Sequence, residues 1–194
     1  MIYVTSDFHI SHENIMKYCN RYKSHKNITD YIDNLFYQLQ SLKETDIFFY
    51  LGDLACSKDK SVEICKKYID KIKCKEKHFI RGNHDTWLTD DDIYKIGFKT
   101  IRDYLVINDT LFCHYPLDET YGKYGNYKEH KYLWDLFFNN DNIKTIIHGH
   151  IHNNRSIRKD KKYINVSVDK KVGKFNIYAL KNIDKDLFLQ EIYK

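Results

Sequence analysis

The sequence IIHGHIHNN, residues 146–154, places three histidines at alternate positions directly after two β-branched residues. Side chains at alternate positions of an extended strand point to the same side. If the strand continues to residue 152, then His148, His150 and His152 converge on one point. Such a convergence suits a metal ion or a proton transfer, and the alternative is a set of packed histidines. The stretch therefore predicts a strand that leads into a polar site, and similar strands precede it.

Eight short runs rich in β-branched and aromatic residues predict strands. They are residues 2–5, 47–51, 78–80, 104–107, 111–113, 145–147, 163–168 and 175–180. Apolar residues at helical spacing predict helices over 28–42 and 64–72, and an aromatic segment predicts another over 132–138.

The order of these elements indicates the fold class. The first half alternates strands with helices, whereas the second half is mostly strands. This order predicts an α/β protein in which two mixed β-sheets pack together and helices flank them, a four-layer α-β-β-α sandwich. The chain has one proline, Pro116, and neither repeats nor linker-like segments, so residues 1–194 are expected to form a single domain.

Composition indicates which substrates and which cellular location are compatible with the protein. The net charge of +5 permits an anionic substrate, and the mean hydropathy of -0.65 is ordinary for a soluble protein. No apolar run is long enough to span a bilayer, and the first residues do not resemble a signal peptide, so we expect no membrane association and a cytoplasmic location. Five cysteines without CxxC spacing indicate reduced thiols.

Polar blocks follow five of the predicted strands. They read SDFH at 6–9, GDLA at 52–55, GNHD at 82–85, CHYP at 113–116 and HGHIH at 148–152. Taken alone, a histidine is more often structural than catalytic, and a Gly-Asp pair is usually a turn. Because the ends of neighbouring strands can meet at one sheet edge, the five blocks together predict a site there.

In this order, the blocks resemble the D-x-H, GD, GNHD, H, GHxH pattern of the calcineurin-like metallophosphoesterase superfamily, from Asp7 to His152. The longer stretches SDFHISHENIMKYCNR, HYPL and INVSVD resemble a group of small phage and bacterial phosphoesterases. The resemblance implies a hydrolase with two divalent metal ions. Nitrogen and oxygen ligands suit Mn, Fe, Ni, Zn or Co, and we favour Mn.

The resemblance also assigns roles to residues. It implies that Asp53 is shared by the two metals and that a hydroxide bridging them attacks phosphorus. His84 would stabilise or protonate the reacting phosphate, Asp85 would orient the His84 ring, and His148 would be a packed neighbour of the site. The remaining expected ligands are Asp7, His9 and His152 for the first metal and Asn83, His114 and His150 for the second.

Two regions are candidates for substrate binding. His12 and Asn14 follow the first block and could contact phosphate, although a helix cap or a surface role is an equal alternative. The segment 114–134 interleaves aromatic rings with lysines, among them Tyr115 and Lys123. Such a pattern suits a nucleotide or a single-stranded nucleic acid, and its alternative is a loop that packs its rings on the domain.

The sequence thus predicts a metal-dependent phosphoesterase that favours phosphodiesters over phosphomonoesters, with a nucleotide-like substrate. An alternative is a catalytically inactive interaction module with the same fold, but such a module would usually lack His84 or several ligands. A nucleic-acid-binding protein with a structural zinc is a third possibility, and the carboxylate-rich set opposes it.

Overall fold

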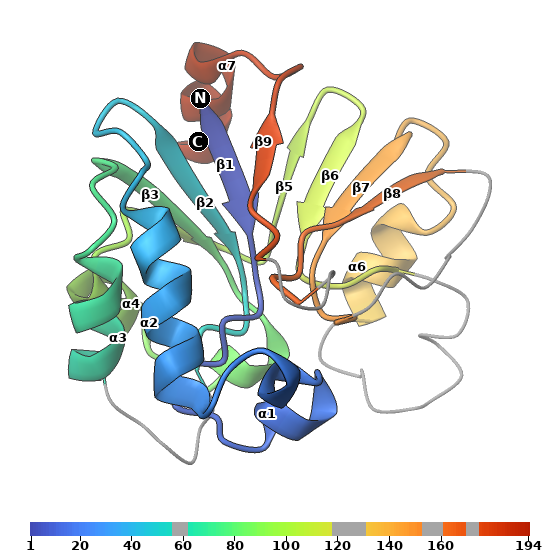
Figure 1. Ribbon diagram of the computed structural model, residues 1–194. Coiled ribbons are helices and arrows are strands. Elements are labelled where there is room, and N and C mark those ends of the chain that lie inside the picture. Colours follow the sequence, from blue (N-terminus) through green and yellow to red (C-terminus); the bar gives the residue numbers. More distant parts are fainter. Residues whose placement is uncertain (56–61, 118–130, 153–160, 170–174) are drawn as a thin grey trace.

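The computed structural model describes residues 1–55, 62–117, 131–152, 161–169 and 175–194 (Figure 1). Two β-sheets form the centre of this part of the chain. None of its helices combines the length and the apolar character needed to cross a membrane.

The first sheet has five strands in the order β4-β3-β2-β1-β9. Four of them are parallel, and β9 runs antiparallel to β1. All five residues of β2 are buried, as expected for a central parallel strand with both faces covered. The bounds are β1 Ile2–Thr5, β2 Ile47–Leu51, β3 Glu76–Ile80, β4 Thr100–Arg102 and β9 Tyr178–Leu180.

The second sheet has four strands in the order β5-β6-β7-β8. β5 and β6 are antiparallel, whereas β6, β7 and β8 are parallel. Both sheets are therefore mixed, as the sequence predicts. The bounds are β5 Tyr104–Ile107, β6 Thr110–Cys113, β7 Thr145–His148 and β8 Lys162–Asn165.

Helices cover the outer face of each sheet. The apolar side of α2 (Ile28–Leu39) packs with α3 (Val62–Ile69) and α4 (Asp90–Ile96) in one core cluster against the first sheet. The helix α6 (Lys131–Phe137) contributes Leu133 and Phe137 to a second cluster on the other sheet. This arrangement confirms two mixed sheets flanked by helices (Figure 1).

A third cluster fills the space between the sheets, and α7 (Lys185–Ile192) contributes to it. The Phe49 ring lies 5.4 Å from Phe112 and 5.1 Å from Phe188, measured between ring centroids. These rings connect β2, β6 and α7. In Figure 1, α7 lies beside the N-terminus, while α1 (Ile15–Tyr18) lies at the opposite end of β1.

Candidate dinuclear metal centre

The five polar blocks lie at the carboxyl ends of β1, β2, β3, β6 and β7. Pairing between β1, β2 and β3, and between β6 and β7, is parallel, so these ends share an edge within each sheet. An isolated bridge between Ser6 and Ser167 joins the two sheets at this edge. The fold therefore gathers the blocks at the ends of the strands.

The backbone is left-handed at four of the expected ligands. The φ angles are 64° at Asp7, 50° at His9, 61° at Asp53 and 66° at His150. Residues with a Cβ rarely adopt this conformation, and such strain clusters at functional sites. β7 ends at His148, so the chain turns before residue 152 instead of continuing as a strand. The condition for convergence of all three histidines, a strand that reaches residue 152, is therefore not met, and the turn brings His150 and His152 close to Asp7.

Two glycines allow these turns to pack closely. A Cβ at Gly149 would lie 2.6 Å from Oδ2 of Asp7, and a Cβ at Gly52 would lie 2.8 Å from Nδ1 of His114. Both distances are shorter than a carbon atom tolerates. The absence of a side chain at these positions lets one polar block approach another.

Asp7, His9 and His152 form the first donor group. Nε2 of His9 lies 3.3 Å from Nε2 of His152, which lies 3.5 Å from Oδ1 of Asp7. The backbone N–H of His150 donates to both oxygens of Asp7, and Ser6 Oγ donates to one of them. Asp7 thereby links the end of β1 to the turn after β7.

Asp53, His114 and His150 form the second donor group. Nε2 of His114 lies 3.3 Å from Oδ2 of Asp53, and Nδ1 of His150 lies 3.0 Å from Oδ1 of Asn83. Nδ1 of His114 donates to the carbonyl oxygen of Leu51 at 2.7 Å, which leaves Nε2 directed toward the carboxylate. All four expected ligands of this group are thus close together.

Asp53 joins the two groups. Its Oδ1 accepts a hydrogen bond from the backbone N–H of His84 at 2.9 Å. Its Oδ2 lies 3.6 Å from Nε2 of His9 and 3.3 Å from Nε2 of His114. One carboxylate oxygen therefore faces a donor from each group, as a bridging ligand requires.

The donor set fits divalent cations. Ligand atoms about 2.1 Å from a tetrahedral metal are roughly 3.4 Å from one another. The separations of 3.3 to 3.6 Å among the donors of His9, His114, His152, Asp7 and Asp53 agree with this spacing. Nε2 of His114 is buried and faces Oδ2 of Asp53, and a cation bound to both atoms would satisfy them.

Burial and neighbouring charges shift the pKa values of these groups in opposite directions. Burial raises the pKa of Asp53, but the His114 and His9 imidazoles outweigh it and hold this pKa below its usual value. Burial lowers the pKa of His114, but Asp53 overcomes it and raises this pKa to about 9. Burial, reinforced by His114, lowers the pKa of His150 to about 3. The neutral His150 imidazole keeps a lone pair available for a metal.

His84 lies at the partly exposed side of the site, in the short 3-10 helix Asn83–Asp85. Its ring centroid is 5.0 Å from that of His9, and a ring nitrogen comes within 4.8 Å of donor atoms of His9 and Asp53. This position suits contact with a substrate held over the donor groups. The same position would also allow direct ligation of a cation.

Asp85 makes different contacts from those expected. Its carboxylate accepts hydrogen bonds from the backbone N–H groups of Asp53, Leu54 and Gly82, at 2.7, 2.9 and 2.8 Å. Burial and the Asp53 charge raise the pKa of Asp85 to about 7. The expectation that Asp85 orients the His84 ring is therefore corrected, because its oxygens hold the backbone of the turn that carries Asp53.

The remaining histidine of the opening stretch is packed. His148 is fully buried, and its ring centroid lies 6.0 Å from that of Tyr163. Within the described ranges it belongs to neither donor group. Its placement agrees with the expected neighbouring role.

The predicted substrate-binding residues have different surroundings. His12 is near the site, with its ring centroid 6.0 Å from that of His84, whereas Asn14 is exposed before α1 and makes no side-chain cap. Tyr115 is 1% exposed and packs 5.4 Å from His150, and this burial opposes the expectation that its ring binds substrate. Lys123 lies outside the described residues.

Sequence reasoning did not assign roles to Arg21 and Asp169, which adjoin the first donor group. Oδ2 of Asp169 lies 2.8 Å from Nδ1 of His152, and Arg21 forms an ion pair with Asp169. Both residues lie within the stretches that resemble small phosphoesterases, but neither belongs to a metal-ligand pattern. The resemblance of these longer stretches was therefore the sequence signal that could have identified Arg21 and Asp169.

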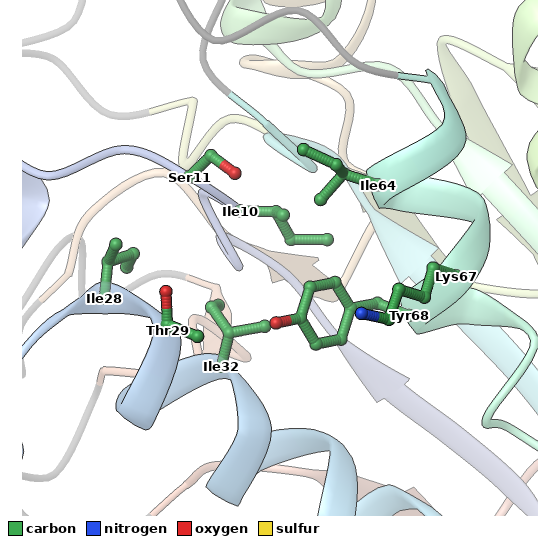
Figure 2. Close-up of a pocket in the computed structure, with 8 residues that line it drawn as sticks. All are labelled: Ile10, Ser11, Ile28, Thr29, Ile32, Ile64, Lys67 and Tyr68. Atoms are coloured by element: carbon green, nitrogen blue, oxygen red, sulfur yellow. The ribbon is translucent and has the colours of Figure 1, made fainter.

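A separate cavity of about 220 Å³ lies between α2 and α3 (Figure 2). Its wall includes Ile10 and Ser11, which follow His9, together with Ile32 and Tyr68. None of the donor residues lines it. The cavity is therefore adjacent in sequence to the site but distinct from it.

Comparisons with known proteins agree with this site. Residues 1–154 match the family model of the calcineurin-like phosphoesterases. The chain belongs to this family, whose members are hydrolases of phosphoesters that use a dinuclear divalent metal centre.

Individual relatives extend the similarity over the full length. The uncharacterised protein MJ1445 of Methanocaldococcus jannaschii is 31% identical over 100% of this chain and 92% of its own. The structure of AQ665, a protein of unknown function from Aquifex aeolicus, matches 87% of this chain and 90% of its own with 26% identity and a TM-score of 0.64. Nuclease MPE from Pseudomonas putida is more distant, at 13% identity over 95% of this chain and 81% of its own, with a TM-score of 0.47.

Proposed function

We propose that this protein hydrolyses phosphoester bonds with two divalent cations, and that its substrates are phosphodiesters of the nucleotide type. The observation that carries the proposal is Oδ2 of Asp53, which faces a histidine nitrogen of each donor group. We infer that Asp7, His9, Asp53 and His152 hold one cation and that Asp53, Asn83, His114 and His150 hold the other. Manganese is our preferred metal.

The chain's own groups would bind and orient the phosphate. When bound, two divalent cations would neutralise phosphate charge and lower the pKa of a water molecule, so that hydroxide is available to attack phosphorus. His84, at the partly exposed side, would donate a hydrogen bond or a proton to the phosphoryl or leaving-group oxygen. Asp85 would keep the Asp53 turn fixed through its three backbone hydrogen bonds.

A nucleotide-like substrate is supported by the segment that follows His12. Tyr18 and Tyr22 are 73% and 56% exposed, and Lys17 and Lys23 next to them are exposed as well. Exposed rings can stack on bases while lysines meet phosphates. This segment replaces the buried Tyr115 as our candidate for base contacts.

Hydrolysis assays test the proposal. Enzyme stripped with a chelator and reloaded with Mn, Ni, Zn, Co or Fe is compared on bis-p-nitrophenyl phosphate, p-nitrophenyl phosphate, cyclic nucleotides and dinucleotides. We expect the highest kcat/KM on a nucleotide diester with Mn. Faster turnover of monoesters would contradict the diester preference, and no turnover with any metal would contradict the proposed activity.

The variant Asp53→Asn tests whether this site is responsible for the activity. It keeps the size of the side chain but removes the charge that both cations would share. We expect a weaker hold on both metals and a loss of activity of at least a hundredfold, and wild-type activity would exclude this site. If both forms proved inactive while the fold persisted, the alternative of an inactive interaction module would replace this proposal.

A further inference from the structure

A buried ion pair lies directly behind the first donor group. Arg21 is 2% exposed and Asp169 is 9% exposed. Nε of Arg21 donates to Oδ1 of Asp169 at 2.9 Å, and Nη2 donates to Oδ2 at 2.6 Å. The pair is bidentate, which fixes the plane of the carboxylate.

Arg21 also holds the backbone that carries two expected ligands. Nη1 donates to the carbonyl oxygen of Phe8 at 2.9 Å, and Nη2 donates to that of Asp7 at 2.8 Å. The guanidinium therefore links Asp169 to the left-handed turn after β1. This link fixes the position of Asp169 relative to Asp7 and His9.

The carboxylate of Asp169 in turn determines the state of His152. An ionised carboxylate only accepts hydrogen bonds, so Nδ1 of His152 must donate across the 2.8 Å contact to Oδ2. In the neutral imidazole, the proton on Nδ1 leaves the lone pair on Nε2. That atom lies 3.3 Å from Nε2 of His9 and 3.5 Å from Oδ1 of Asp7, which is the side of the first donor group.

We infer that Asp169 is a positioning residue, held by Arg21, that selects the tautomer of His152 able to bind the first cation. The inference rests on the proposed metal centre. It extends that centre beyond its ligands to residues from the 3-10 helix Arg21–Lys23 and from the segment after β8.

A purely structural role does not account for the geometry. Buried ion pairs often contribute little net stability, because removing two charges from water is costly. Here the carboxylate orients one particular ring nitrogen of one ligand. Such partners of metal-binding histidines commonly change metal affinity by about ten- to a hundredfold when removed.

Burial lowers the pKa of His152, but Asp7 and Asp169 outweigh it and raise this pKa. The direct test therefore measures the tautomer of His152 in metal-free protein at an alkaline pH that leaves the imidazole neutral. Long-range proton–nitrogen NMR spectra distinguish an imidazole protonated at Nδ1 from one protonated at Nε2. We expect the Nδ1–H form in the wild type. An Nε2–H form would overturn the inference without any variant, even if the variants below failed to fold.

The double variant Arg21→Met, Asp169→Leu removes both charges together and so avoids an unpaired buried ion. We expect a mixture of His152 tautomers and a ten- to hundredfold loss of Mn²⁺ affinity at one site, with the second site unchanged, measured by calorimetric titration. The control Tyr31→Phe deletes the hydrogen bond to the other carboxylate oxygen and should keep wild-type Mn²⁺ binding.

The outcomes separate this inference from the proposed function. Two wild-type Mn²⁺ affinities in the double variant would overturn the positioning role while leaving the metal centre intact. A wild-type protein that bound no divalent cation would overturn the proposed centre and this inference with it.

Discussion

At the scale of single residues, the two carboxylate oxygens of Asp53 have different roles. Oδ1 accepts a backbone hydrogen bond from His84, and Oδ2 remains directed at the imidazoles of both donor groups. The positive φ of Asp53 is stabilised by Asp85, which accepts its backbone N–H. The strain at the ligand is therefore offset by hydrogen bonds from a neighbouring segment.

The variant His84→Asn distinguishes a catalytic role of His84 from direct ligation of a metal. We expect kcat to fall by about a hundred- to ten-thousandfold, because a general acid or hydrogen-bond donor is lost. The main-chain contact to Asp53 remains, so two metal ions per chain should remain. Kinetics and elemental analysis of the purified variant measure both quantities. A variant that retained only one metal ion would make His84 a ligand.

Individual site residues were predictable where a strand-end motif contained them. The seven expected ligands meet in the two donor groups because each follows a strand of the same layered fold. The contacts of Asp85, the burial of Tyr115 and the Arg21–Asp169 pair were not predictable from spacing. They depend on segments up to 148 residues apart in the chain.

At the scale of elements, the edge formed by β3, β4 and α7 contains a buried histidine remote from the site. Nδ1 of His78 contacts Oγ1 of Thr100 at 3.0 Å, and its ring packs against Phe188 and Tyr193. Burial lowers the pKa of His78 to about 4, although the neighbouring Glu76 opposes the shift. The folded protein therefore holds this imidazole neutral at mildly acidic pH.

This histidine makes stability depend on pH. Since the folded pKa is near 4 and an unfolded histidine has a pKa near 6.5, the unfolded state binds more protons between these values. Stability should then fall as the pH drops from about 6.5 to 4, by on the order of 1 to 3 kcal/mol from this group.

Chemical denaturation at several pH values measures this dependence. We expect His78→Gln to flatten the loss of stability between pH 6.5 and about 4. An unaltered pH dependence in His78→Gln would contradict the assignment.

Elements with a clear apolar pattern were predicted well, and several elements with a weaker pattern were missed. β1, β2 and β5 have the predicted bounds, but α4, α7 and β4 were not anticipated. β4 has only three half-buried residues, which give little periodic signal. α4 does carry signals, a Thr89 capping box and Gly97 after its last residue, and α7 begins at the cap Asp184. A search of the sequence for capping residues would have predicted both helices.

At the scale of the whole molecule, the two ends of the sandwich differ in character. One end carries the strained polar turns and the donor groups, while α7 packs on the inter-sheet core beside the N-terminus (Figure 1). The alternation of strands and helices predicted these layers. It could not predict that α7 packs on the inter-sheet core, because that position depends on the aromatic contact between Phe188 and Phe49 of β2.

The inter-sheet core should therefore control stability more than metal binding. Phe188 is fully buried, so Phe188→Ala should reduce the free energy of unfolding by about 3 to 5 kcal/mol. Metal stoichiometry at low temperature should be unchanged, since the site lies at the other end of β1. Urea titration and elemental analysis provide the two readouts. The control Leu136→Ala, at a side chain that is 51% exposed, should cost less than about 0.5 kcal/mol.

The account as a whole depends on a pair of cations at one sheet edge, and anomalous diffraction from crystals grown with Mn²⁺ measures it most directly. We predict two peaks about 3.5 to 4 Å apart, one on each side of Asp53. One peak should adjoin Asp7, His9 and His152, and the other should adjoin Asn83, His114 and His150. A single peak away from Asp53, or no peak among these side chains, would contradict the account.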